Sequence, residues 1–350
     1  SIYKAEELFK NVADKNHPME TVLTIIQGKG TLPREQAGRN IHYDDASLAN
    51  YKKVEQGDFI IHLRSFEGGL EMANEDGIVS PAYTILRCKK PHSSLFYEAY
   101  FHTDEFINHI LSKSVEGIRD GRQISYEAFK WLGLPYCDVS EQERIAQLFC
   151  TLSHRIEKQQ QMVDALKKYK RGLIKLVFEK VMSEAHYQLP LSDLCISISS
   201  GRTTVNESNG RYPLFGSTGI VGMTNTIEHD GDIVMVARVG ANAGKVNFFS
   251  GRCGVTDNTL VIRVKENTIH PKFLAYFLEN FDLHKLIFGS GQPLVTGGQL
   301  KKIQSPVIAY KAQLLFTRSL ESLDRIIGTQ DTYMEKLIQL KSGLMQRLFI

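Results

Sequence analysis

The stretches IAQLFCTLSHRIEKQQQMVDALKKYKRGLIKLV (residues 145–177) and FTRSLESLDRIIGTQDTYMEKLIQLKSGLMQRL (residues 316–348) carry one pattern twice in a single chain. From the first residue of each stretch, alternating steps of four and three residues reach ten positions, of which eight are apolar. Gln and Lys interrupt both series at matching places. A sustained apolar period of 3.5 residues is typical of coiled-coil helices. The sequence therefore predicts two long helices that pair with each other.

The expected pairing contacts follow from these two series. They are Ile145, Phe149, Leu152, Ile156, Gln159, Val163, Leu166, Leu320, Leu323, Ile327, Gln330, Met334, Leu337 and Leu344. An antiparallel arrangement is expected to bring Gln159 close to Gln330, where two buried amides can satisfy each other and set the register. Gly172 and Gly343 also match, and either a close helix approach or a kink accounts for them.

The repeat extends upstream of the helices, with small insertions that change the offset. Residues 57–64 match 231–238, and residues 79–87 match 255–263. The predicted fold class is α+β, with two tandem mixed α/β domains, each followed by a long helix, and the two helices forming an antiparallel coiled coil. The predicted boundaries are 1–138 and 183–309 for the domains and 139–182 and 310–350 for the helices. The large loops differ between the halves, which indicates different specificities on a shared frame.

Local patterns predict the elements of each domain. Apolar β-branched runs predict strands, and helical periodicity predicts the segments that follow them. The sequence Ser140-Glu141-Gln142-Glu143 has the form of a capping box at the start of the first long helix. The predicted strands are 57–64, 78–87, 231–238 and 258–264, and the predicted shorter helices are 95–111 and 271–288.

Composition describes ordinary globular domains in a chain of 350 residues. The hydrophobic content is 42%, and no apolar run approaches the roughly 18 residues of a membrane helix. The first residues lack the pattern of a signal peptide. Five cysteines without C-x-x-C spacing indicate free thiols, as expected in the cytoplasm. The net charge of +3 is too small for a dedicated non-specific DNA binder, so DNA contacts would need local basic patches.

Motifs for catalysis are absent from the sequence. Residues 240–245 (GANAGK) have three residues between the glycines where a P-loop needs four, which favours a hairpin turn. The sequence has no G-x-S-x-G elbow, no H-E-x-x-H pair and no zinc spacing of His and Cys. The N-P-P-[FYW] and D-P-P-[FYW] tetrads of amino-methyltransferases are also missing. We therefore expect no catalytic residue, no metal site and no cofactor on this chain.

Several segments together resemble one family. A proline, a few residues, a glutamine and then a long helix occur in order twice. Soft motifs recur in both halves, and their duplication in order is more specific than any one of them. The segments are 134–146 and 305–315, 289–293 with 300–303, 57–60 with 77–83, and 231–234 with Arg238, Gly240 and Gly244. Over nearly its whole length, the chain resembles the specificity subunit of a type I DNA restriction-modification system.

The resemblance implies a division of labour between subunits. Two target-recognition domains each read one half of a split double-stranded DNA sequence, and the paired helices fix the spacer between the halves. The helices also dock two modification subunits, which bind S-adenosylmethionine and methylate adenine. Restriction subunits, which need ATP and Mg²⁺, join that core. The first half has little sequence before residues 7–9, which predicts a shortened N-terminus.

Loops with Arg, Lys, Asn or Gln suit contacts with bases and phosphates. For any one of them, a solvated surface side chain is an equally good interpretation. Arg64 and Arg238, which end matching strands, are read as structural residues or as DNA contacts. The basic run 167–171 is read as a solvated or subunit-facing helix surface. The DNA-binding candidates are Lys29, Arg34, Arg39, Arg119, Arg122, Gln123, Arg202, Arg211, Asn242, Lys245 and Gln292.

Two other classes of protein compete with this reading. One is a fused restriction-methylation enzyme, against which the missing methyltransferase and nuclease motifs argue. The other is a coiled-coil adaptor that binds no DNA. Two large modules with diverged loops fit an adaptor poorly, because a scaffold does not need such loops.

Overall fold

The computed structural model describes residues 1–350 except 39–44, 118–121, 186, 205–208, 288–292 and 350. The fold is mixed α+β, and the two predicted long helices are present as α5 (Val139–Glu184) and α9 (Tyr310–Leu348). The chain divides into two compact units. Unit 1 contains residues 1–160 and 332–350, and unit 2 contains residues 161–331. Each unit therefore holds one module together with part of each long helix.

Unit 1 contains a four-stranded antiparallel sheet in the order β2-β9-β6-β7. Its strands and α-helices are β1 (Ile2–Lys4), α1 (Ala5–Leu8), β2 (Phe9–Val12), β3 (Leu23–Ile26), β4 (Gly30–Pro33), β5 (Lys52–Val54), β6 (Phe59–Ile61), α2 (Ser65–Gly68), β7 (Glu71–Met72), β8 (Gly77–Val79), β9 (Thr84–Cys88), α3 (Ser94–Phe101), β10 (Val115–Glu116), β11 (Gln123–Ile124), α4 (Tyr126–Phe129) and β12 (Gly133–Pro135). Aromatic side chains of β2, β6 and α3 fill its core, with Phe9, Phe59 and Phe101 fully buried.

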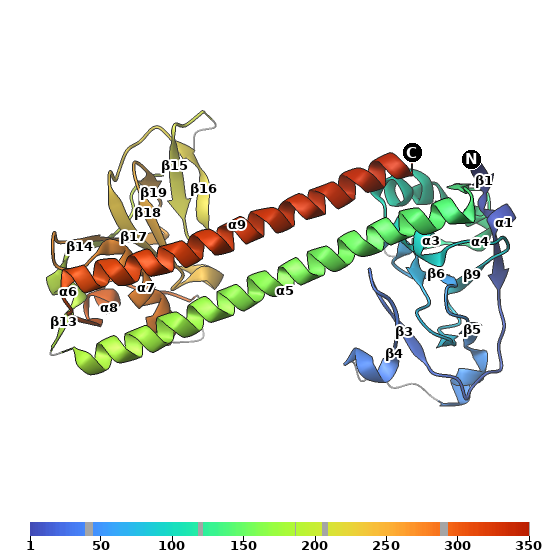
Figure 1. The fold of residues 1–350 in the computed structure, drawn as a ribbon, viewed down its shortest axis with the longest axis horizontal. Helices are drawn as coiled ribbons and strands as arrows, with labels where there is room; N and C mark the ends of the chain where they lie inside the picture. Colours follow the sequence, from blue (N-terminus) through green and yellow to red (C-terminus); the bar gives the residue numbers. More distant parts are fainter. Residues whose placement is uncertain (39–44, 118–121, 186, 205–208, 288–292, 350) are drawn as a thin grey trace. The chain divides into compact units, whose positions relative to one another are not determined.

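Unit 2 contains a four-stranded antiparallel sheet in the order β14-β20-β17-β18. Its strands and α-helices are β13 (Gln188–Pro190), α6 (Leu191–Leu194), β14 (Cys195–Ser200), β15 (Tyr212–Gly216), β16 (Gly219–Thr224), β17 (Asp232–Ala237), β18 (Val246–Ser250), β19 (Gly254–Val255), β20 (Thr259–Val264), α7 (Pro271–Phe281), α8 (Gly297–Lys301) and β21 (Gln304–Pro306). Helix α7 packs beside β17 and β18 (Figure 1).

The two modules share one topology. Strands β2, β9, β6 and β7 correspond in order to β14, β20, β17 and β18. In unit 1, β1 pairs with β12, and in unit 2, β13 pairs with β21 in the same antiparallel way. This correspondence also places Ile2–Leu8 opposite Gln188–Leu194, so the opening strand and short helix are present in both modules.

Parts of the two long helices contact each other inside each unit, always in opposite order along the chain. In unit 1, the ring centroids of Phe149 and Phe349 are 5.8 Å apart. Further along α5, an Arg155 guanidinium nitrogen donates to the Tyr333 hydroxyl at 2.7 Å. In unit 2, Lys167 pairs with Asp331 and Lys170 with Asp324, at 3.0 and 2.7 Å, and Phe178 contacts Phe316. Within each unit the helix segments therefore run antiparallel.

The predicted pairing positions are buried or half-buried throughout, with Val163 and Leu320 fully buried. Gln159 is buried and Gln330 is half-buried, but their proximity stays a prediction. At Gly172 and Gly343, an added Cβ would meet no atom within 4 Å, so close helix approach does not explain these glycines.

A buried glutamine fixes the start of each long helix to its module. The Gln142 amide oxygen accepts from the Ser93 backbone N–H at 3.0 Å, and its nitrogen donates to the Cys137 carbonyl at 2.9 Å. Gln313 does the same with the N–H of His270 and the carbonyl of Ile308, at 2.8 and 3.0 Å. Ser93 and His270 both precede the helix that packs on the sheet. The matched Pro-to-Gln motif therefore joins three segments of each module.

Replacing Gln142 or Gln313 by alanine should lower the free energy of unfolding by about 1–3 kcal/mol, because a buried N–H and a buried C=O lose their partners. Chemical denaturation of the full chain measures this. Exposed Gln147, on the same helix as Gln142, is the matched control, and its substitution by alanine should change stability by less than about 0.5 kcal/mol. Equal effects at Gln142 and Gln147 would contradict the bridging role.

The structure corrects two details of the predicted helices. The Asp138 carboxylate, rather than Ser140, caps α5, because it accepts the Ser140 backbone N–H at 2.8 Å. The helix predicted over residues 95–111 breaks after Phe101. There the Thr103 hydroxyl donates to the Tyr100 carbonyl at 2.8 Å and accepts the Phe106 N–H at 3.0 Å. A threonine side chain that bonds to nearby backbone in this way competes with the regular helix ladder.

Candidate nucleic-acid interface

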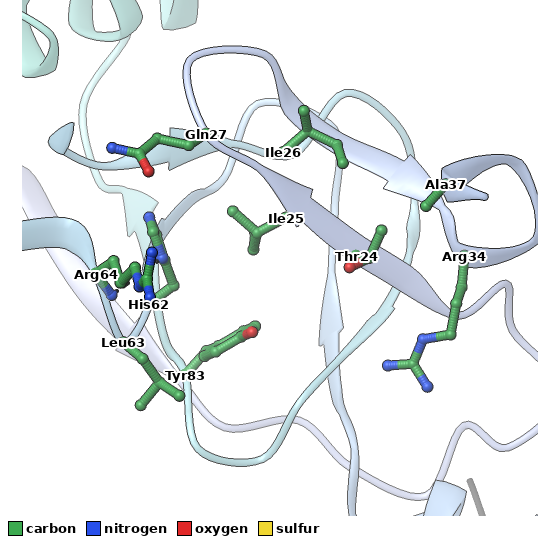
Figure 2. Close-up of a pocket in the computed structure, with 10 residues that line it drawn as sticks. All are labelled: Thr24, Ile25, Ile26, Gln27, Arg34, Ala37, His62, Leu63, Arg64 and Tyr83. Atoms are coloured by element: carbon green, nitrogen blue, oxygen red, sulfur yellow. Dashed lines mark hydrogen bonds between the residues drawn. The ribbon is translucent and has the colours of Figure 1, made fainter. Parts of the chain in front are cut away.

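The first module has a cavity of about 680 Å³ beside the β3–β4 hairpin. The hairpin supplies one side, and the segment after β6 together with Tyr83 supplies the other. In the view of Figure 2, Ile25 and Tyr83 lie between the two arginines. The lining residues are Thr24, Ile25, Ile26, Gln27, Arg34, Ala37, His62, Leu63, Arg64 and Tyr83. An apolar floor with guanidinium, amide and hydroxyl groups around it suits a planar polar ligand edge.

His62 offers this cavity a fixed hydrogen-bond donor. Its Nδ1 accepts the Arg64 backbone N–H at 3.3 Å, so a neutral ring carries its proton on Nε2. Burial lowers the pKa of His62, which keeps the ring neutral near pH 7. The Nε2 atom is buried and has no hydrogen-bond partner within the described part of the chain. A ligand oxygen or ring nitrogen would satisfy it.

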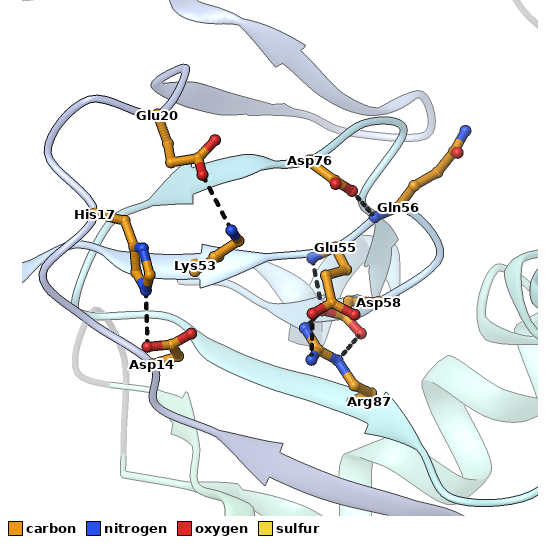
Figure 3. A network of polar contacts seen from close by, with 9 residues as sticks. All are labelled: Asp14, His17, Glu20, Lys53, Glu55, Gln56, Asp58, Asp76 and Arg87. Carbon is orange, nitrogen blue, oxygen red and sulfur yellow. Dashed lines mark hydrogen bonds and ion pairs between the residues drawn. The ribbon is translucent and has the colours of Figure 1, made fainter.

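A network of charged side chains braces the sheet of the same module (Figure 3). Arg87 on β9 binds the buried Asp58 carboxylate through two nitrogens, at 2.9 and 2.7 Å, and Glu55 at 2.7 Å. Nearby, Lys53 pairs with Glu20 at 3.0 Å. Bidentate Arg–carboxylate contacts are geometrically specific, so they join β6 and β9 at the strand ends opposite the cavity.

The predicted residues of the first module occupy different environments. Lys29 is exposed in the turn between β3 and β4, and the Arg34 guanidinium lies 5.9 Å from the Tyr51 ring centroid. The Arg122 guanidinium covers the Phe66 ring at 4.2 Å, beside Gln123 on the short β10–β11 hairpin. Arg39 and Arg119 lie outside the described residues, as does Gln292 of the second module. Arg34 therefore lines the cavity, whereas Arg122 packs on the Phe66 ring.

In the second module, the predicted residues lie on three loops. The backbone N–H of Arg202 donates to the Glu228 carboxylate at 2.9 Å, and its side chain is exposed. Arg211 is exposed just before β15. Asn242 and Lys245 belong to the turn between β17 and β18, where the Lys245 N–H donates to the Asn242 carbonyl at 2.9 Å. This turn confirms that residues 240–245 form a hairpin connection rather than a P-loop.

A second, smaller cavity of about 230 Å³ opens at the carboxyl end of β17. Arg238 and Lys301 line it together with Ser200, whose hydroxyl accepts from Arg238 at 3.3 Å. Neither cation has a carboxylate partner in the part of the chain that the structure describes. Two cations beside hydroxyl groups suit a phosphate oxygen.

Comparison with known proteins relates part of the chain to a described family. Residues 188–337 match the family described as type I restriction modification DNA specificity domain. The second module is therefore similar to such a specificity domain. The matched residues include β13 through β21 and most of α9. The resemblance to type I specificity subunits is thereby confirmed, and curated relatives and solved structures agree with it.

Curated relatives match parts of the chain. The type I restriction enzyme EcoprrI specificity subunit of Escherichia coli is 27% identical over 35% of this chain and 30% of its own length. The putative MjaX specificity subunit of Methanocaldococcus jannaschii is 32% identical over 26% of this chain and 23% of its own. The chain therefore spans about a third or less of the length of these two relatives.

Two crystal structures share the fold. The type I restriction-modification S subunit from M. genitalium has a TM-score of 0.65 and 13% sequence identity, over 100% of this chain and 96% of that one. The HsdS subunit from Thermoanaerobacter tengcongensis has a TM-score of 0.53 and 14% identity, with the same coverage. At these identities the likeness concerns the fold alone.

Sequence reasoning missed several residues that line the cavities of the two modules. His62, Gln27 and Tyr83 line the larger cavity, and Lys301 lines the smaller one. The only available signal was the repeat itself, which places Arg64 and Arg238 at matching strand ends beside the two cavities. No described helix is long and apolar enough to cross a membrane. The DNA-binding roles of all these residues stay predictions.

Proposed function

We propose that this chain is a non-catalytic DNA-recognition subunit that reads a bipartite target in double-stranded DNA. It would direct adenine methylation and restriction by two modification subunits and by restriction subunits. The main support for this proposal is that the two modules share one sheet topology but present different polar surfaces. A shared frame with diverged surfaces is what two readers of different half-sites require.

In this proposal, α5 and α9 form an antiparallel coiled coil that sets the spacer between the half-sites. The contacts of the helix segments within each unit support this. Helices of this length span about 60 Å at roughly 1.5 Å per residue. A spacer of fixed length would hold two half-sites about one helical turn of DNA apart, roughly 34–36 Å.

The chemistry is assigned to partner subunits, which would bind S-adenosylmethionine, ATP and Mg²⁺. Helix α5 offers them an exposed apolar line at seven-residue spacing, formed by Met162, Tyr169 and Leu176 with exposed fractions of 48%, 62% and 66%. Methyl transfer from S-adenosylmethionine by the purified chain alone would favour the fused enzyme instead. Failure to bind any DNA would favour the adaptor.

The cations of the smaller cavity give a direct test of DNA binding. A duplex is first selected by the full chain from a random pool, and its dissociation constant is measured over a salt series. Arg238→Ala and Lys301→Ala should each reduce the slope of log K against log salt by about 1, because one phosphate contact is lost. Exposed Lys175 on α5 is the matched control, and Lys175→Ala should leave the slope unchanged. Unchanged slopes in all three variants would contradict the phosphate contact.

A further inference from the structure

The turn between β3 and β4 presents two exposed polar side chains, Gln27 and Lys29. Its shape depends on glycines, because Gly28 and Gly30 have φ angles of 75° and 77°, which side chains with a Cβ rarely adopt. At Gly30, an added Cβ would lie 2.5 Å from the Met72 carbonyl oxygen. The turn therefore packs directly against β7 and cannot shift toward it.

The Glu71 carboxylate on β7 accepts hydrogen bonds from the backbone of this turn. Its Oε1 accepts the Gly28 N–H at 2.7 Å, and its Oε2 accepts the Gly30 N–H at 2.9 Å. The Glu71 side chain is fully buried. A buried carboxylate is costly unless a cation or several donors compensate it. A group that receives both amides of one turn is therefore placed to fix that turn.

His102 supplies the cation. Its Nδ1 lies 2.8 Å from the Glu98 carbonyl oxygen, and its Nε2 lies 3.3 Å from Glu71 Oε1. A carbonyl and a carboxylate only accept hydrogen bonds, so the ring makes both hydrogen bonds only when both of its nitrogens carry protons. Burial alone would lower the pKa of His102, but the hydrogen bonds to Glu71 and to the Glu98 carbonyl outweigh it and raise the pKa. The same contact and the two glycine amides lower the pKa of Glu71, despite its burial.

Other titratable groups surround the His102 ring, on α3, on α5 and α9, and on the segment after β6. Burial raises the pKa of the Glu98 side chain and lowers that of Lys341, whose ammonium donates to the Ser153 hydroxyl at 2.8 Å. The groups are His62, Glu98, Cys150, His154, Glu157 and Lys341.

We propose that Glu71 and His102 are positioning residues, which hold the β3–β4 turn so that Gln27 and Lys29 meet DNA, and that they make DNA binding by the first module weaken as pH rises. This inference rests on the proposed function. Below its pKa, the imidazolium donates to Glu71. Above it, the ring keeps the proton on Nδ1 for the Glu98 carbonyl, and the Nε2 lone pair then faces the carboxylate. The turn then loses a support, and because the pKa of His102 is raised, this loss occurs at a higher pH than it would for an ordinary histidine.

The second module uses a carboxylate in the same way without a charged histidine. Glu228 accepts the N–H groups of Arg202 and Thr203 and the Thr203 hydroxyl, at 2.9, 3.1 and 2.7 Å. Burial lowers the pKa of the neighbouring His229, so its ring is neutral near pH 7. The second module is therefore an internal control, because its loop support should not titrate in this range.

The test uses the full chain and the duplex that it selects from a random pool. Dissociation constants are measured from about pH 6 to about pH 9, across the titration of a histidine. The wild-type chain should lose about tenfold in affinity over this range, the size expected for one charge-assisted contact. His102→Gln can still donate to Glu71 but cannot titrate, so its profile should be flatter. Lys29→Ala should weaken binding and flatten the profile as well, whereas Glu228→Gln should weaken binding and keep the wild-type slope.

Two measurements on the free protein separate this inference from the proposed function. Nuclear magnetic resonance should give His102 a pKa above the ordinary value. Amide exchange at Gly28 and Gly30 should be slow in the wild type and fast in Glu71→Gln. A His102 pKa below the ordinary value, or equal pH profiles for wild type and His102→Gln, would overturn the inference. If the chain selects no duplex, the proposed function fails, and the resonance and exchange results still decide the roles of Glu71 and His102.

Discussion

Replacing Phe178 by alanine is expected to lower the free energy of unfolding of unit 2 by about 3–5 kcal/mol. The Phe178 ring, on α5, is only 1% exposed. It contacts Phe273 and Phe277 of α7 and Phe316 of α9, with ring centroids 5.1, 5.6 and 5.3 Å apart. One side chain thus joins both long helices to the module, and its removal leaves a cavity among three aromatic rings.

Denaturant unfolding of the full chain, followed by a probe in unit 2, measures this change. Leu176 is the matched control, because it lies two residues away on the same helix and is 66% exposed. Leu176→Ala should change stability by less than about 0.5 kcal/mol. A loss below about 1 kcal/mol for Phe178→Ala would show that α5 is not anchored to the module through this ring.

Exchanging residues 183–309 for the same module of a relative should rewrite one half of the methylated DNA motif and leave the other half intact. The structure favours such an exchange, because β13 and β21 pair with each other at the two ends of the segment. The chain thus enters and leaves the module at one two-stranded ladder. The core of the module is built mainly from its own β14, β17, β20 and α7.

The result is measured by methylome sequencing. One host carries the partner subunits with the original chain, and a second carries them with the exchanged chain. The exchange of residues 1–138, which begin and end near the β1–β12 ladder, is the reciprocal control and should change the other half of the motif. A matched insertion in α5 and α9 should alter the spacer instead. If one module exchange changed both half-sites together, the two-reader proposal would be wrong.

The long helices and the repeat could be predicted because their signals are periodic and duplicated. Buried apolar residues recur over many turns of both helices, as at Phe149, Val163, Leu320 and Leu337. One polar residue in such a series does not obscure the helical period. The break at Thr103 could not be predicted with equal ease, since it depends on one hydroxyl that bonds to local backbone. Helix ends are decided by such single side chains, as Asp138 shows for α5.

The candidate site was less predictable than the fold. Loop arginines and lysines can be listed from the sequence, but a contact such as Arg122 on Phe66 depends on residues distant in the chain. Glu71 gave no signal, because a single glutamate among strand residues is usually exposed. Only the tertiary fold brings it under a turn 41 residues earlier in the chain. Arg64 and Arg238 could be singled out from the sequence, because they occupy equivalent positions in the two repeats. Local sequence alone would not have distinguished them.

The amides of Gln142 and Gln313 have a mechanical consequence. Each one ties a strand end, the residue before a packed helix and the first turn of a long helix into a single joint. Such a joint has little compliance, because a rotation of the helix would have to break buried hydrogen bonds. If a bound subunit twisted either long helix, the module attached to that helix would therefore rotate with it. A flexible linker would instead absorb the twist. The orientation of each reading surface would follow the strain in its helix.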